Sequence, residues 1–123
     1  MESPGTRFAQ SLAAKDESSL RGLLAPDVDF RALTPGRPWE AADADGVLRA
    51  VFGSWFEPSD EIMDVLEVRD GEDVVDTHAV GYRFKVRNRG GTYLVEQQAY
   101  YRCDANGRIH HLRVLCSGYR PVD

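Results

Sequence analysis

The stretch Thr92–Tyr119, TYLVEQQAYYRCDANGRIHHLRVLCSGY, decides the fold of this chain. Two runs rich in strand-forming residues flank the turn formers Asp104–Gly107, and this pattern predicts a long β-hairpin. A four-residue loop pairs Cys103 with Arg108. Counting onward from that pair, the predicted cross-strand neighbours are Tyr101–His110, Ala99–Leu112, Gln97–Val114 and Val95–Cys116.

Because side chains alternate along a strand, this register also sorts the hairpin into two faces. The mostly apolar set is predicted to face the interior, and it comprises Tyr93, Val95, Gln97, Ala99, Tyr101, Leu112, Val114 and Cys116. The outer set comprises Glu96, Gln98, Tyr100, Arg102, His111 and Arg113.

The N-terminal half reads mainly as helices. Ser3 can cap a first helix that carries Phe8 and Leu12 on one face, and Asp16 can cap a second helix that Pro26 stops. A short strand is expected over 28–33, followed by a loop over 34–42 that carries Trp39. The third helix is predicted to start at Asp43 or Asp45 and to end at Pro58, with its apolar face made by Leu48, Val51, Phe52 and Trp55.

Two further strands are expected over 61–69 and 73–87, and the turn Asn88–Gly91 leads into the hairpin. This turn predicts the pairs Phe84–Val95, Tyr82–Gln97, Val80–Ala99 and His78–Tyr101.

Helices followed by an antiparallel meander indicate an α+β fold, and the 123 residues are expected to form one domain, 1–123. A twisted sheet with one apolar face can curl around its helices and leave a hydrophobic pocket. The predicted lining of that pocket is Phe30, Ala32, Trp39, Phe52, Trp55, Phe56, Val80, Tyr82, Phe84, Val95, Gln97, Ala99, Leu112, Val114 and Cys116.

Composition and spacing exclude several classes of function. The net charge of −5 argues against a nucleic-acid partner, and no apolar run approaches the roughly 18 residues of a membrane helix. Cys103 and Cys116 are predicted about 26 Å apart along a strand, beyond the roughly 7 Å limit of a disulfide, so free thiols in the cytoplasm are expected. No metal spacing is present, because the neighbours His110 and His111 point to opposite faces, and no cofactor is expected.

The order of elements and the runs SLRGLLAPDVDF (19–30) and YYRCDANGRIHHLRVL (100–115) resemble the nuclear transport factor 2-like superfamily. That group includes ketosteroid isomerases and SnoaL-like polyketide cyclases. The resemblance covers nearly the whole chain and implies a cone-shaped domain, a hydrophobic pocket inside the cone and frequent dimerisation. It does not imply one function, because members include enzymes and non-catalytic binding modules.

The resemblance can be compared residue by residue. Positions matching the isomerases' tyrosine and two aspartic acids read Phe8, Ala32 and Ala99, none of which exchanges a proton through its side chain. Epoxide hydrolases of the superfamily depend on inward Arg and Asp side chains, whereas Arg102 is predicted to point outward. Neither mechanism is therefore expected.

Two groups of inward polar residues remain as candidate sites. The first is His78–Tyr101–His110 with Asp76 nearby, a set that could move protons near neutral pH or could simply close one end of the cone with hydrogen bonds. The second is Tyr82–Gln97 beside Cys116. This second group could hold the carbonyl or hydroxyl of a mostly apolar ligand, or could make only an internal hydrogen bond.

The outer face of the sheet is predicted to mix charges with apolar groups. Arg83 is expected opposite Glu96 and Gln98 opposite Arg113, and the apolar residues among them are Leu94, Tyr100 and Leu115. Such a surface is typical of a two-fold interface, so a homodimer is expected through this face.

Three hypotheses about function follow, and they leave open whether the chain is an enzyme. The first is a cofactor-independent SnoaL-like cyclase, isomerase or dehydratase acting on a hydrophobic, oxygenated, ring-containing molecule, with His78 as acid and base and Tyr82, Gln97 and Tyr101 as donors. The second is a domain that binds or senses a small hydrophobic molecule without catalysis. The third is a scaffold whose pocket has collapsed.

Overall fold

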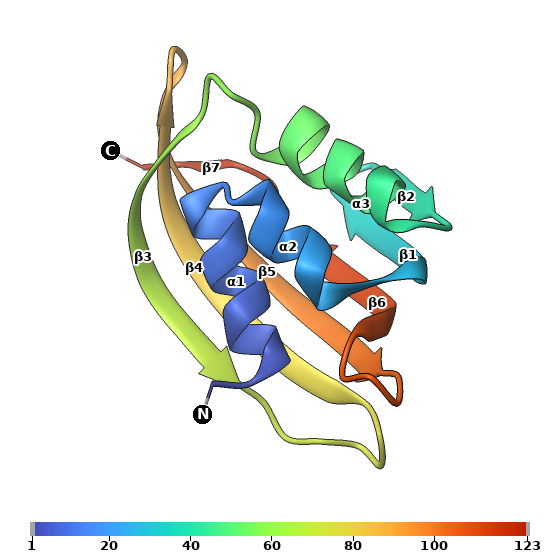
Figure 1. The fold of residues 1–123 in the computed structure, drawn as a ribbon. Coiled ribbons are helices and arrows are strands. Elements are labelled where there is room, and N and C mark those ends of the chain that lie inside the picture. The colour runs from blue at the N-terminus through green and yellow to red at the C-terminus, as the bar shows by residue number, and fades with distance from the viewer. Residues whose placement is uncertain (1, 123) are drawn as a thin grey trace.

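The computed structural model describes residues 2–122. Helices α1 (Pro4–Ala14), α2 (Glu17–Leu23) and α3 (Ala44–Ala50) and the π-helical turn η1 (Val51–Trp55) pack inside a curved sheet (Figure 1). The strands are β1 (Leu24–Thr34), β2 (Arg37–Ala41), β3 (Glu61–Asp70), β4 (His78–Asn88), β5 (Gly91–Cys103), β6 (Ile109–Cys116) and β7 (Arg120–Pro121). Their order in the described chain is β2-β1-β6-β5-β4-β3, with β7 beside β5. The predicted α+β fold class is confirmed.

The helices begin where polar side chains cap them. Ser3 accepts a hydrogen bond from the Thr6 N–H, and Asp16 caps α2 in the same way. Asp43, not Asp45, caps α3. The predicted helix runs without a break to Trp55, before Pro58, but its second half is not α-helical, because α3 ends at Ala50 and continues as the π-helical η1.

The register of β4 against β5 is as predicted. His78, Val80, Tyr82 and Phe84 lie opposite their expected partners, since the tight reversal at Asn88–Gly91 fixes the count. Strand β4 is shorter than predicted, however. Residues 73–77 form a turn, and β4 begins only at His78.

The register of β5 against β6 differs from the prediction by two residues. The Asp104 N–H donates to the Arg108 carbonyl, so the loop is closed by Asp104 and Arg108 rather than by Cys103 and Arg108, and the pairing shifts by one residue. A β-bulge after Arg102 shifts the pairing by one residue more. The observed pairs are Cys103–Ile109, Tyr101–Leu112, Ala99–Val114, Gln97–Cys116 and, on the outer face, Gln98–Leu115 in place of Gln98–Arg113. Because the total shift is even, Leu112, Val114 and Cys116 keep their predicted inner face.

The predicted loop over 34–42 is also wrong. Residues Arg37–Ala41 form β2, which pairs antiparallel with β1 and places Trp39 opposite Ala32. Pro38 is compatible with this strand because β2 lies at the edge of the sheet. On its other side β1 pairs in parallel with β6, and this long-range pairing joins β1 and β2 to the rest of the sheet.

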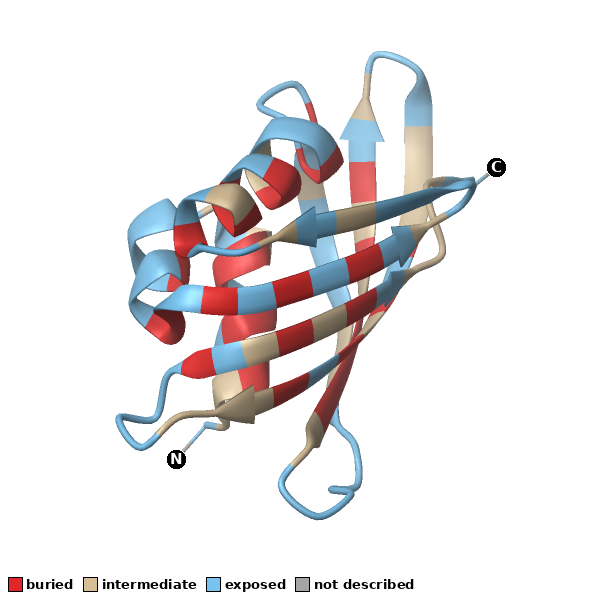
Figure 2. Ribbon diagram, turned by 90° about the vertical axis from the view of Figure 1, so that its right-hand side faces the viewer, coloured by how far each residue is buried: buried red, intermediate tan, exposed pale blue. Residues whose placement is uncertain are grey.

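Buried residues alternate with less buried ones along most of β5 and β6 (Figure 2). The main hydrophobic core lies between the helices and this inner face and includes Phe8, Leu12 and Leu20 from the helices and Phe30, Val80, Phe84, Val95 and Leu112 from the sheet. Burial of this apolar surface is the main force that holds the two layers together.

The first turn of α1 lies very close to the sheet at Gly5. A Cβ atom there would come within 2.8 Å of both the Tyr101 ring and Val80 Cβ. We expect Gly5→Ala to lower the free energy of unfolding by about 1–3 kcal/mol, because α1 must move away from the sheet. Chemical denaturation measures this change.

Gly22→Ala in α2 is the matched control, since nothing lies within 4 Å of a Cβ at that position. It should raise the free energy of unfolding by about 0.5–1 kcal/mol, as alanine favours a helix. Equal effects of the two substitutions would contradict the close contact at Gly5.

Candidate functional site

The centre of the inner face holds a buried pair of polar side chains. Tyr82 of β4 and Gln97 of β5 are cross-strand neighbours, and each is 2% exposed. The Tyr82 hydroxyl donates to Gln97 Oε1 over 2.6 Å. Burial, assisted by nearby Cys116, raises the pKa of Tyr82 well above its ordinary value, so the phenol stays protonated and can donate. The internal hydrogen bond considered from the sequence is therefore present.

The same pair leaves one strong donor without a partner. Gln97 Nε2 is buried and has no hydrogen-bond acceptor among the described residues. The hydrogen bond from Tyr82 holds the amide oxygen, which fixes the direction of the amide N–H groups. Such an unpaired buried donor costs about 1–3 kcal/mol, so it is an uncommon feature in an otherwise apolar core.

A second unpaired donor lies in the helical layer. The indole Nε1 of Trp55 is buried without an acceptor in the described part of the chain. Trp55 stands at the end of η1, and its ring is 5.9 Å from that of Phe30 and 5.9 Å from that of Trp39. The sequence placed Trp55 in the pocket lining but gave no sign of this free donor.

The predicted lining residues meet inside the sheet, but they pack against one another. The Tyr82 ring lies 5.3 Å from that of Phe84, and the Phe56 ring lies 5.8 Å from that of Phe84. Phe30, Phe84 and Leu112 are 0% exposed, so no water-sized space borders their side chains. This part of the interior is therefore filled.

Three of the predicted lining residues are not fully buried. Trp39 and Phe52 are only half-buried, and Cys116 is half-buried beside the same core. The Trp39 indole donates to Thr34 Oγ1 over 2.8 Å, and the Arg37 guanidinium lies 3.6 Å above the Trp39 ring. The rings of Trp39 and Trp55 meet at the corner between β2 and η1, 5.9 Å apart.

The histidine group lies elsewhere, at the end of β4 and β5 beneath the first turn of α1. His78 and Tyr101 are neighbours as predicted, with ring centroids 5.3 Å apart. The Tyr101 hydroxyl accepts the Gly5 N–H over 2.9 Å, and burial raises the pKa of Tyr101. The carboxylate beside His78 is Asp73, with its Oδ1 2.9 Å from Nδ1.

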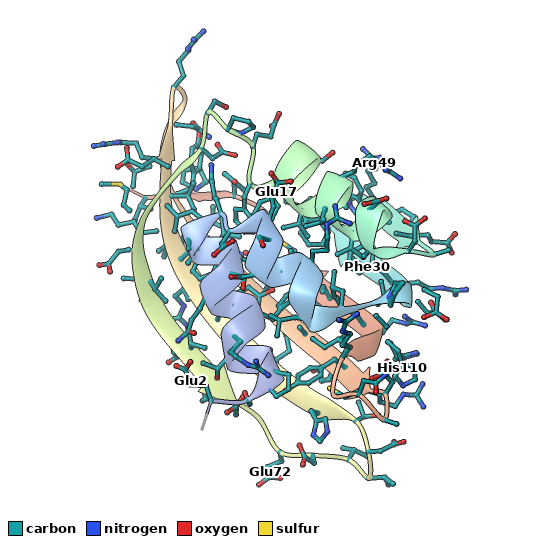
Figure 3. The ribbon with its side chains drawn as sticks, in the orientation of Figure 1. Glu2, Glu17, Phe30, Arg49, Glu72 and His110 are labelled. Atoms are coloured by element: carbon teal, nitrogen blue, oxygen red, sulfur yellow. The ribbon has the colours of Figure 1, made fainter. Side chains whose placement is uncertain are left out.

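Two members of the predicted histidine group are not in it. Asp76 is exposed in the turn before β4, and Asp73 rather than Asp76 lies beside His78. His110 is the unpaired extra residue on the β6 side of the bulge, and it is exposed. It lies at the edge of the molecule, in contrast to Phe30, which lies between the helices and the sheet (Figure 3). What remains is a partly exposed Asp73–His78–Tyr101 set.

This set is separate from the Tyr82–Gln97 pair. Tyr101 is four residues from Gln97 along β5, which corresponds to about 13 Å at roughly 3.3 Å per residue. The two groups therefore stand on separate parts of the strand. Phe8, Ala32 and Ala99, the positions compared with the isomerases, are buried and apolar, and Arg102 contacts His111 on the outer face.

Sequence reasoning missed the best-bonded carboxylate of the molecule. Asp60 is 6% exposed and accepts hydrogen bonds from the Glu57 N–H, Asn88 and the Tyr119 hydroxyl. Lys15 donates to the Asp60 carbonyl. Burial and this carboxylate raise the pKa of Tyr119. Asp60 joins the end of α1, β4 and the C-terminal segment, and the turn-forming run EPSD (57–60) was its only signal in the sequence.

The sequence predicts neither a metal site nor a membrane-spanning helix. Within residues 2–122, no three histidine, cysteine, aspartate or glutamate side chains come together as metal ligands. No helix of that range is long and apolar enough to cross a membrane. Cys103 and Cys116 are free thiols, as predicted.

Comparison with known proteins supports the fold. No family model matches the sequence, and no curated protein matches it. A candidate isomerase from Rhodopseudomonas palustris is similar in structure, with a TM-score of 0.70, 15% identity and coverage of 96% of this chain and 92% of its own. An LEH-like epoxide hydrolase from M. tuberculosis has a TM-score of 0.68, 13% identity and coverage of 93% and 80%.

A candidate SnoaL-like polyketide cyclase from Mesorhizobium loti is also similar, with a TM-score of 0.62, 16% identity and coverage of 90% of this chain and 94% of its own. The chain therefore has the fold of SnoaL-like proteins, which the resemblance predicted. At these identities the comparison concerns the fold alone, because one fold hosts many functions.

The Tyr82–Gln97 pair makes a prediction about stability. Tyr82→Phe should lower the free energy of unfolding by about 1–3 kcal/mol, since it leaves the buried Gln97 oxygen unpaired, whereas Gln97→Met should cost less, since it also removes the unpaired Nε2. The double variant should come back to within about 1 kcal/mol of the wild type, because it removes both polar groups. A thermodynamic cycle from urea denaturation measures this coupling, and simply additive losses would contradict it.

Proposed function

We propose that this chain is a binding domain for a small, neutral organic molecule that carries a hydrogen-bond acceptor such as a carbonyl oxygen. The observation that supports the proposal is the buried, unpaired N–H of Gln97, held in place by Tyr82. A ligand oxygen would satisfy this donor, and the surrounding aromatic side chains would contact the apolar remainder of the ligand.

The charges around the site favour a neutral ligand. Gln97 is surrounded by an apolar cluster, and Asp60 is the one charged residue classed as buried in residues 2–122. An anion in this core would have no cation to offset its loss of hydration. The Trp55 indole is a second buried donor without an acceptor in the described chain, and a ligand that reached it would place an oxygen there as well.

The ligand would enter between β2 and η1. Trp39 is half-buried there and meets the Trp55 ring, in contrast to the sealed side chains deeper in the core. The π-helical turn η1 is a departure from regular helix of a kind often found at functional sites. Binding would require these aromatic side chains to move apart, because the core around Phe30 is filled.

Binding without turnover is favoured over catalysis. The candidate acid–base residues His78 and Tyr101 lie about 13 Å from Gln97 along the strands, and the positions of the isomerase acids are alanines. The two free thiols favour a reducing compartment, so we place the domain in the cytoplasm.

An enzymatic role in the manner of a cyclase, isomerase or dehydratase is the second candidate. The observation in its favour is the His78–Asp73 contact of 2.9 Å beside Tyr101, because a carboxylate fixes the imidazole for proton transfer. In that case His78→Ala must abolish turnover of a bound ketone without loss of folding. Recovery of the ligand chemically unchanged from the wild type supports the binding role instead.

A matched pair of probes tests the binding proposal. 1-Tetralone and tetralin share one ring skeleton and differ in the carbonyl oxygen. We expect 1-tetralone to raise the Tm of the wild type more than tetralin does, because only the ketone accepts from Gln97. Calorimetric titration should give the same order of affinities.

The double variant Tyr82→Phe/Gln97→Met is the control, because its core lacks the donor while its packing is retained. It should bind both probes equally. The anion 1-naphthoate should not bind the wild type. Equal binding of ketone and hydrocarbon by the wild type, or no binding of either, would contradict the proposal.

A further inference from the structure

The segment after β6 forms a strap along β5 at one end of the sheet. We call residues 117–122 the C-terminal strap, and the short strand β7 lies within it. Backbone bonds tie the strap to β5 near its two ends, from the Ser117 N–H to the Glu96 carbonyl and from the Val122 N–H to the Thr92 carbonyl. β7 itself is only two residues long and is exposed. So little pairing places the strap among the least stable parts of the fold.

Tyr119 is the side chain that fastens the strap to the helical layer. Its ring lies 6.4 Å from that of Phe56 and 5.5 Å from that of Tyr93. Its hydroxyl lies 2.7 Å from the Trp55 carbonyl oxygen and 2.9 Å from Asp60 Oδ2, so both acceptors share its proton. The strap therefore holds the end of η1 through one phenol.

The strap also contacts the other side of the proposed entry, at the turn between β1 and β2. The backbone of Gly118 passes this turn so closely that a Cβ atom there would lie 2.8 Å from Pro35 Cγ. Gly118 has a φ of +77°, in the left-handed region that favours glycine. Beside Pro35, the Thr34 hydroxyl accepts from the Trp39 indole. The strap thus joins the β1–β2 turn to η1, and the ligand would enter between β2 and η1 (Figure 1).

The end of η1 carries two rings that cover this part of the core. Trp55 is 7% and Phe56 is 1% exposed, and the Phe56 ring lies 5.8 Å from that of Phe84. The Phe56 N–H donates to the Val51 carbonyl over 2.7 Å and so closes η1. Because the Trp55 carbonyl lies between these two side chains along the chain, its bond from Tyr119 restrains both rings.

We propose that the C-terminal strap gates the core, so that Tyr119 must leave η1 before a ligand can enter. Opening breaks the bonds of the Tyr119 hydroxyl and the short β7 pairing, and η1 then carries Trp55 and Phe56 outward. Ligand entry by this route rests on the proposed function, whereas the joint opening of strap and η1 does not. A ligand that binds only the open form associates no faster than the strap opens.

Amide hydrogen exchange, followed by NMR without any ligand, tests whether the strap and η1 open together. Tyr119→Phe removes the hydroxyl but keeps the ring, and it should speed exchange of the Phe56 amide roughly tenfold or more. Gly118→Ala disturbs the strap at the β1–β2 turn, away from η1, and should also speed exchange at Phe56. Amides in the centre of β4 and β5 should keep their wild-type rates, whereas a general loss of stability would speed them as well.

Tyr93→Phe is the matched control for the strap variants. It makes the same chemical change on a ring that packs against Tyr119, but it removes no bond to η1 in the described chain. Exchange of the Phe56 amide should therefore stay at the wild-type rate.

Binding of 1-tetralone, followed by tryptophan fluorescence after rapid mixing, tests the gate itself. The wild-type rate should level off at high ketone concentration, and Tyr119→Phe should raise that plateau by the factor seen in exchange. Faster exchange without any ketone binding would confirm the strap's hold on η1 while refuting the proposed function. An unchanged Phe56 amide in either strap variant, or an unchanged plateau in Tyr119→Phe, would overturn the gate.

Discussion

The alternation of side chains along β5 is the constraint on which the rest of the structure depends. This strand pairs with β4 on one side and β6 on the other, so one register decides which residues of three strands face the helices. It places Gln97 in the core opposite Tyr82 and sends Glu96 and Gln98 outward. A shift by one residue would expose the apolar row and bury the charges, which the hydrophobic effect does not allow.

The buried polar pair Tyr82–Gln97 sets this core apart from a purely apolar one. An apolar pair at Tyr82 and Gln97 would complete the core without leaving a donor unpaired. The amide is held by its oxygen, while its N–H has no acceptor in the described chain. The fold, shared with proteins of several activities, does not account for this arrangement. It is therefore the side chains of this chain, and not its fold, that favour a ligand.

Much of the fold could be predicted because its signals are local. The caps at Ser3 and Asp16 and the reversal at Asn88–Gly91 gave two helix starts and the β4–β5 pairing. The β5–β6 register was wrong by two residues, because neither the closing pair Asp104–Arg108 nor the bulge can be counted from composition. The inner face nevertheless remained correct, since an even shift preserves it.

The candidate site was harder to predict, because its contacts join distant segments. Asp73 rather than Asp76 stands beside His78, and His110 is displaced by the bulge, so the structure brings together only His78 and Tyr101 of the predicted group. Asp60 and Tyr119 meet across 59 residues of sequence. The unpaired donors of Gln97 and Trp55 become evident only once every neighbour is placed.

The most direct test of the central claim is the nitrogen–proton NMR signal of the Gln97 side-chain amide, assigned by comparison with Gln97→Met. If this amide is a free donor inside the core, 1-tetralone should move its proton resonance downfield, as a new hydrogen bond does, while tetralin should not. An amide signal that stays unchanged by the ketone, or that exchanges with water as fast as an exposed glutamine, would contradict the account.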